Sequence, residues 1–178
     1  MTRPWTLRAA SPGDAPALAA ILVRTWRQRY PGLVAPEVLD ALDERAFAEW
    51  FARVLDLSSG HNATLATVDG ADAGFIHFGP EEEDPARGHV FSFYVAPPHS
   101  GRGMGRELLA HALSALRAEG YRVVTLWVFK DNAATQRLYA RAGFRPDGAE
   151  RVEDEFGVPE QRLRLDLGTS NAWQGLTR

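Results

Sequence analysis

The chain has 178 residues, a formal net charge of −3 and no cysteine, and its length suits a single domain. The lack of cysteine excludes a disulfide scaffold, a thiolate nucleophile and a Cys-based zinc site. The only lysine, Lys130, follows Phe129 and not glycine, which excludes a P-loop nucleotide site. No apolar run is long enough for a membrane span or a signal peptide, and no long basic run suggests nucleic acid. We therefore expect a cytoplasmic α/β domain with neither a membrane nor a nucleic acid as partner.

Hydrophobic periodicity predicts the elements in chain order. Ser11 and Pro12 suit the N-cap and first position of a helix, and Asp69-Gly70 suits a hairpin turn. The predicted elements are strand 5–9, helix 11–29, a helical region 36–57 interrupted near Asp43, strands 63–68, 74–78 and 90–96, a helix from Gly103 to Gly120, strand 122–129, helix 132–142 and two last strands after residue 144. The order β-α-α-β-β-β-α-β-α-β-β predicts one domain over residues 5–167, with helices on a central mixed sheet. Residues 168–178 are polar and are expected to form a loose tail.

The most informative segment is a glycine-rich loop between a strand and an amphipathic helix, at residues 101–106. The first amides of a helix have no intrahelical partner and lie at the positive end of the helix dipole. Glycine lets a bulky anion approach the backbone, and Arg102 and Arg106 can add bidentate contacts to phosphate oxygens. The loop thus predicts a phosphate or pyrophosphate cradle, with a plain helix-entry turn as the alternative. It does not fit the dinucleotide fingerprint, because Arg106 stands where the third glycine would be.

Tyr94-Val95 followed by Gly101-Arg102-Gly103-Met104-Gly105-Arg106 resembles the acetyl-CoA pyrophosphate loop of the GNAT superfamily of N-acetyltransferases. A second match follows at the expected separation, in Asn132-Ala133-Ala134, Leu138-Tyr139 and Ala142-Gly143-Phe144. The resemblance covers roughly residues 5–167. One position departs from the family pattern: Ser100 stands where Gln or Arg is usual, so one side chain to the pyrophosphate is missing, and Arg102 is the candidate to replace it.

The resemblance implies an α+β fold with a mostly antiparallel sheet of six to seven strands flanked by helices. It implies a V-shaped gap between two strands, which holds the pantetheine arm, and direct transfer of an acetyl group from acetyl-CoA to a primary amine, without a metal. That amine could belong to a small molecule, a polyamine, a protein or a peptide, and a homodimer is compatible with the family. The implied cofactor contacts are Phe93, Tyr94, Val95, Gly101, Arg102, Gly103, Met104, Gly105, Arg106, Asn132 and Tyr139.

Acetyl transfer to an amine requires proton transfers, because an amine with a pKa of about 10.4 costs roughly 4–5 kcal/mol to deprotonate at pH 7. The resemblance gives Tyr139 the role of general acid toward the leaving thiolate, with a tyrosine packed on the sheet as the alternative. His89 is the candidate base, unless it is a surface histidine at a strand edge. The acidic loop Glu81–Glu83 and water are the other candidates for the base. A solvated loop is the simpler interpretation of the acids, and attraction of a cationic amine is the alternative.

Acceptor binding is assigned to aromatic residues of the first helix. Trp26 and Tyr30 resemble a Trp-x-x-x-Tyr-x-Gly signature of one GNAT subgroup, but a helical aromatic stripe also suits a core. The four-residue spacing, just before a helix break at Pro31, favours at least one of them in the acceptor cleft. The alternative function is a non-catalytic acyl-CoA-binding or regulatory module on the same fold.

Overall fold

The computed structural model describes residues 4–56, 59–153, 156–168 and 172–177. The helices are η1 (Pro12–Asp14), α1 (Ala15–Arg29), α2 (Pro36–Asp40), α3 (Glu44–Val54), η2 (Pro97–His99), α4 (Met104–Ala118), α5 (Ala133–Ala142) and η3 (Ala172–Thr177). The strands are β1 (Thr6–Ala9), β2 (Asn62–Val68), β3 (Ala71–Pro80), β4 (Gly88–Val95), β5 (Val123–Phe129), β6 (Arg145–Val152) and β7 (Pro159–Asp166). This order confirms the predicted sequence of elements. The interruption near Asp43 is also confirmed, since the Asp43 side chain caps α3 by accepting a hydrogen bond from the Arg45 amide at 2.8 Å.

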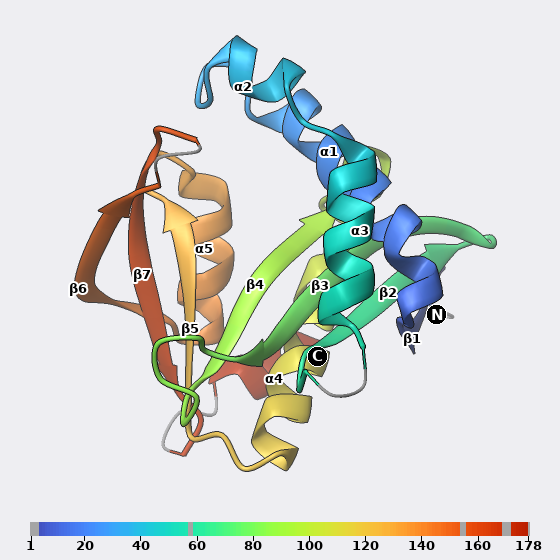
Figure 1. The fold of residues 1–178 in the computed structure, drawn as a ribbon. Coiled ribbons are helices and arrows are strands. Elements are labelled where there is room, and N and C mark those ends of the chain that lie inside the picture. The colour runs from blue at the N-terminus through green and yellow to red at the C-terminus, as the bar shows by residue number, and fades with distance from the viewer. Residues whose placement is uncertain (1–3, 57–58, 154–155, 169–171, 178) are drawn as a thin grey trace.

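The strands form one open sheet in the order β1-β2-β3-β4-β5-β7-β6 (Figure 1). Every neighbouring pair is antiparallel except β4 and β5, which run parallel. One core packs α1, α2 and α3 on one face of the sheet, and a second core packs α4 and α5 on the other. The α+β fold with a central, mostly antiparallel mixed sheet is therefore confirmed.

The two parallel strands stay together over a short length only. Their register joins Gly88 to Val124, His89 to Thr125 and Val90 to Leu126, and no pair follows. Beyond Val90, β4 continues along β3 while β5 continues along β7, so the two strands diverge (Figure 1). The sheet thus opens into a gap at its centre, and each strand keeps a full partner on its other side.

The end of the chain differs from the expectation of a loose tail. After β7, residues 172–177 form η3, in which Trp173 and Leu176 are buried. Both belong to the core that contains α4 and α5. Burial of one indole ring and one leucine removes enough apolar surface from water to hold a short segment in place. Most residues around Trp173 and Leu176 are polar, so the sequence did not indicate that these two side chains are buried. The predicted helical end at Leu57 lies outside the described residues.

Candidate active site

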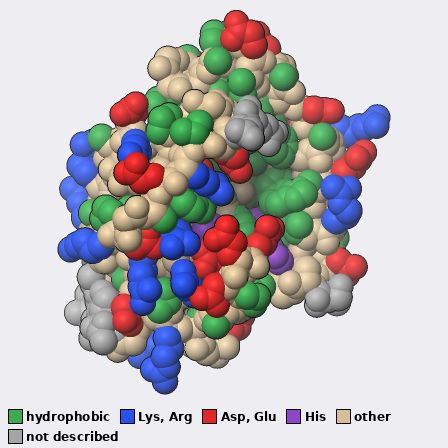
Figure 2. Space-filling view, turned by 60° about the vertical axis from the view of Figure 1, so that its left-hand side comes forward, with side chains coloured by type: hydrophobic (Ala, Val, Ile, Leu, Met, Phe, Trp, Pro, Cys, Tyr) green, Lys and Arg blue, Asp and Glu red, His purple; other side chains and the backbone are tan. Residues whose placement is uncertain are grey.

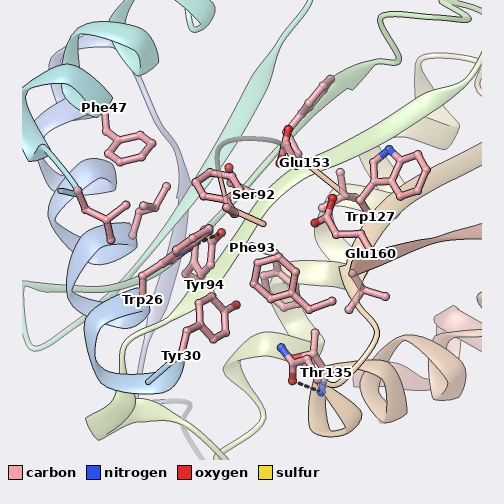
Figure 3. Close-up of a pocket in the computed structure, with 18 of the residues that line it drawn as sticks. Trp26, Tyr30, Phe47, Ser92, Phe93, Tyr94, Trp127, Thr135, Glu153 and Glu160 are labelled. Atoms are coloured by element: carbon pink, nitrogen blue, oxygen red, sulfur yellow. Dashed lines mark hydrogen bonds between the residues drawn. The ribbon is translucent and has the colours of Figure 1, made fainter. Parts of the chain in front are cut away.

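A cavity of about 950 Å³ lies where β4 and β5 diverge, between these strands and helices α1, α2, α3 and α5. Figure 3 shows Trp26, Tyr30 and Phe47 on the helical side, and Trp127 and Glu160 across from them. Seven of the residues predicted from the sequence line this cavity: Trp26, Tyr30, His89, Phe93, Tyr94, Asn132 and Tyr139. The fold therefore brings the predicted acceptor side, the candidate base and the candidate acid to one space.

Glu81, Glu82 and Glu83 also line the cavity, Val95 ends β4, and the predicted residues from 101 to 106 form the loop and the start of α4. Gly101 and Gly103 have φ angles of +76° and +98°, which side chains other than glycine rarely adopt. The Arg106 guanidinium folds back over the loop, with Nη2 only 3.2 Å from where a Cβ on Gly103 would be. The Met104 side chain is buried in the core, so only its backbone amide can face a ligand. Arg106 folds over the amides of this loop, and Arg102 is exposed beside them. This arrangement suits the binding of an anion.

The backbone of β4 directs an amide into the gap. The Ala96 amide donates to the Ala73 carbonyl on β3 at 2.8 Å. Successive amides along a strand point to opposite sides, so the Val95 amide points away from β3 and toward the side of β5. Since β5 has diverged at this level, this donor has no strand partner there. It is available to a carbonyl oxygen in the gap.

The loop also receives a side chain that the sequence did not predict. Arg29, in the last turn of α1, donates a hydrogen bond to the Ser100 hydroxyl. Ser100 is the residue that departs from the GNAT loop pattern. The separation of 71 residues between the partners explains why no local pattern indicated the contact.

Tyr139 lies on α5, one of the walls of the gap. Asn132 caps this helix, because its side-chain oxygen accepts a hydrogen bond from the Thr135 amide at 3.3 Å (Figure 3). The Tyr139 ring is 6.2 Å from the Phe93 ring and 5.7 Å from the Phe144 ring, measured between centroids. Burial strongly raises the pKa of Tyr139, so its phenol keeps its proton at neutral pH. It can act only as a proton donor there.

A chain of three polar side chains lies where β4 and β5 meet. The Thr125 hydroxyl donates to Glu81 Oε1 at 3.0 Å and lies 2.7 Å from His89 Nδ1. The Thr125 hydroxyl donates its one proton to Glu81, so toward His89 it can only accept a hydrogen bond, from Nδ1–H. His89 therefore carries its proton on Nδ1, and Nε2 keeps a free lone pair. All three residues are buried. The interpretation of His89 as a surface histidine at a strand edge is therefore wrong.

The acidic loop divides into two environments. Glu82 and Glu83 are exposed, as the interpretation of a solvated loop predicts, but Glu81 is 5% exposed. Arg162 Nη1 lies 3.5 Å from Glu81 Oε1, and Arg87 Nη1 lies 3.6 Å from its Oε2. A buried carboxylate needs such cations. Interpreting all three glutamates as solvated was wrong for Glu81, because it immediately follows β3 and enters the sheet.

Burial holds His89 in its neutral form. Desolvation, followed by Arg151 and Arg162, lowers the pKa of His89 to about 4. The Glu81 carboxylate, 3.8 Å from Nδ1, opposes this effect, but the intervening Thr125 hydroxyl satisfies Nδ1 without a second proton. His77 is also buried, and desolvation lowers its pKa to about 3. His89 thus presents a neutral imidazole to the cavity throughout the physiological range.

The acceptor side of the cavity is aromatic. Trp26 donates its indole N–H to the Tyr94 hydroxyl at 2.8 Å. The Trp26 ring contacts the rings of Tyr30, Phe129 and Phe156 at centroid distances of 5.1, 5.8 and 4.7 Å. Trp26 belongs to the core, Tyr30 packs against it, and both line the cavity, so packing in the core does not exclude either ring from the cavity wall.

Neither a metal-binding cluster nor a membrane-spanning helix is found in the part of the chain that the structure describes. Within residues 4–56, 59–153, 156–168 and 172–177, no cluster of three or more His, Asp or Glu side chains is arranged to hold a metal ion. Across the same described residues, no helix is both long enough and apolar enough to cross a membrane.

Comparison with known proteins identifies relatives for this arrangement. Residues 18–144 match the model of the acetyltransferase (GNAT) family. A probable N-acetyltransferase of Mycobacterium tuberculosis is 28% identical over 148 residues, which cover 80% of each chain. A mycothiol acetyltransferase of Tsukamurella paurometabola is 35% identical over 140 residues, covering 76% of this chain and 46% of that protein. The structure of an N-acetyltransferase from Thermoplasma acidophilum in complex with coenzyme A matches with a TM-score of 0.75 at 16% identity, covering 93% of this chain and 99% of that one.

The buried histidines predict how stability depends on pH. An unfolded histidine titrates near pH 6.5, whereas His77 and His89 have pKa values of about 3 and about 4 in the folded chain. Between pH 6.5 and about 4 the unfolded chain binds more protons, so the free energy of unfolding falls as the pH falls. Each histidine contributes up to about 1.4 kcal/mol per pH unit in this window.

We expect His77→Phe to remove one of these two contributions, because phenylalanine retains the packing against Phe91 but cannot take up a proton. Urea unfolding at about pH 5 and about pH 7 measures the difference in each variant. His99→Gln, in η2, serves as the control and should retain the wild-type difference. An equal difference in His77→Phe and wild type would contradict the assignment.

Proposed function

The chain belongs to the acetyltransferase (GNAT) family, and on that premise we propose that it transfers the acetyl group of acetyl-CoA directly to a primary amine. The observation that carries this proposal is that Tyr139 and His89 line one cavity where β4 and β5 separate, and that the Val95 amide lies on the β4 edge beyond the last pair of these strands. The chain has no cysteine that could take up the acetyl group first, which favours direct attack of the amine on the thioester. Family membership makes the protein an acyltransferase, and acetyl-CoA is the cosubstrate that fits it.

Two features of the structure suit acetyl-CoA, namely the loop before α4 and the gap between β4 and β5. The first-turn amides of α4, together with Arg102 and Arg106, offer donors and positive charge for the pyrophosphate. Gly101 and Gly103 keep that loop concave, since each has a positive φ and no side chain to cover the amides. The gap between β4 and β5 supplies strand edges for the amide groups of the pantetheine arm. Asn132, at the start of α5, would contact the same arm.

Three groups of this chain would carry the chemistry. The Val95 amide would stabilise the negative charge that develops on the thioester oxygen. Tyr139 would give its phenolic proton to the departing sulfur. His89 would accept, at Nε2 and directly or through water, the proton that the amine loses as its nitrogen bonds to the acetyl carbon. Glu81 and Thr125 hold His89 in the tautomer that this step needs.

The acid role of Tyr139 predicts a loss of turnover in Tyr139→Phe. Without the phenolic proton the sulfur must leave as a thiolate, so we expect kcat to fall about 10²- to 10⁴-fold. The KM for acetyl-CoA should stay within a few-fold, because the ring and its packing remain. Thiol release at saturating acetyl-CoA measures both constants. The control is Tyr121→Phe, which changes a tyrosine outside the cavity; an unchanged kcat in Tyr139→Phe would exclude the acid role.

The base role of His89 predicts a pH profile without a titration near pH 6.5. Because the pKa of His89 is lowered to about 4, its neutral form is present at every pH above that value. After correction for the fraction of free amine, kcat/KM should be flat between about pH 5.5 and pH 8. His89→Gln should lower kcat/KM about 10²-fold or more across this range, and His99→Gln should not. If His89→Gln matches wild type, the proton passes to water or to another group.

The second candidate function is an acyl-CoA-binding or regulatory module without catalysis. Ser100 favours it, because Gln or Arg is usual at this position of the GNAT loop. Calorimetry with acetyl-CoA, followed by a thiol-release assay over a panel of amines, separates the two functions. Binding together with turnover supports the transferase. Binding without turnover of any amine supports the module.

A further inference from the structure

We propose that the acceptor is a primary amine carried on an uncharged aromatic or bulky apolar body, and not a polyamine or an amino acid. This inference rests on the proposed function. It comes from the uneven distribution of apolar and charged side chains around the cavity (Figure 2), where a hollow lined by hydrophobic groups has acidic groups at its edge.

The helical half of the cavity is mostly apolar. Its apolar lining comes from α1, α2, α3 and the connection between α2 and α3, and consists of Leu22, Trp26, Tyr30, Val38, Ala41, Leu42, Ala46, Phe47 and Trp50. Phe47 and Trp50 remain half-buried, so part of each ring faces the open cavity. A ring or branched alkyl group placed against them removes apolar surface from water on both partners. The two acidic residues of this half, Glu37 and Asp43, are both exposed to solvent, and an unpaired charge placed among the apolar side chains is costly.

Carboxylates dominate the charged lining. Among the residues that the structure describes, seven acidic ones line the cavity, Glu37, Asp43, Glu81, Glu82, Glu83, Glu153 and Glu160, against a single arginine, Arg151. Arg151 is itself compensated, because its guanidinium lies 2.7 Å from Glu160 and 3.6 Å from Glu153. The resulting negative field attracts a cationic amine and repels an acceptor that carries a carboxylate.

These two features together select the acceptor. The negative field attracts the ammonium group of the acceptor. The apolar side chains of the helical half then hold the uncharged part of the acceptor, while its nitrogen faces the gap between β4 and β5. A second ammonium would lie among apolar side chains or have to reach the exposed Glu37 or Asp43, and a carboxylate beside the amine would meet the acidic lining of the cavity. Phenethylamine is the simplest probe with the expected form.

The test compares kcat/KM for phenethylamine with three matched amines at saturating acetyl-CoA. Butylamine lacks the ring, putrescine adds a second ammonium, and phenylalanine adds a carboxylate. We expect phenethylamine to exceed butylamine and putrescine about 10- to 100-fold, from burial of the ring, and to exceed phenylalanine by more. Phe47→Ala should lower kcat/KM for phenethylamine about 10-fold and leave that for butylamine within about 2-fold.

Leu33→Ala is the matched control, because Leu33 packs against the same core but does not line the cavity. Putrescine or phenylalanine used as well as phenethylamine would overturn the inference while leaving the acetyltransferase intact. If no amine is acetylated although acetyl-CoA binds, the proposed function fails and the inference fails with it.

A separate observation assigns a role to Arg29. We infer that this arginine, on the acceptor-side helix α1, adds a positive charge to the pyrophosphate site. Its guanidinium donates to the Ser100 hydroxyl, one residue before the glycine loop, and its side chain is otherwise exposed. It would restore, from another element, the basic group that Ser100 does not provide.

The test uses ligands that differ in their phosphates. Arg29→Ala should raise the Kd of coenzyme A about 10-fold by calorimetry and leave the KM of S-acetylpantetheine, which lacks the pyrophosphate, within about 2-fold. Arg29→Lys should recover part of the affinity. Arg24→Ala, also exposed on α1, is the control. Equal affinity for coenzyme A in Arg29→Ala and wild type, or an equal loss with both ligands, would overturn this role.

Discussion

The site depends on the early separation of β4 and β5. On their outer sides β5 is paired along its whole length with β7, and β4 is paired with β3 except at a bulge at Phe91, but β4 and β5 share only three residue pairs. Backbone groups that face the gap beyond Val90 have no strand partner, and such groups need hydrogen bonds from water or a ligand. The same divergence makes room for the rings of Phe93, Tyr139 and Phe129 at its walls. A binding site with backbone donors is therefore a consequence of the sheet topology.

The point where the strands separate is held by buried polar groups. His89 lies on β4, Thr125 on β5, Glu81 directly after β3 and Arg162 on β7. The interactions among them thus join the two halves of the sheet. Replacing one partner would leave a buried group unsatisfied, which costs more than an ordinary hydrogen bond contributes. This network both fixes the width of the gap and sets the tautomer of His89.

Local patterns in the sequence predicted most of the fold and the glycine-rich loop before α4. The glycine loop, the caps and the hairpin turn at Asp69-Gly70 depend on neighbouring residues, and the structure has them where they were predicted. The burial of Glu81 could not be predicted in this way, because three consecutive glutamates have the composition of a solvated loop. Glu81 contacts Thr125 on β5 and Arg162 on β7, which lie 44 and 81 residues further along the chain.

The contacts that α1 makes with β4 and with the residue before the glycine loop escaped prediction for the same reason. The pairing of Trp26 with Tyr94 joins residues 68 positions apart, and that of Arg29 with Ser100 joins residues 71 apart. Residues 26, 29 and 30 share one side of the last turns of α1, since helical neighbours lie three and four positions apart. That single helix therefore contacts β4, lines the cavity and reaches the residue before the glycine loop. A displacement of α1 would therefore alter the cavity wall and the contact with Ser100 together.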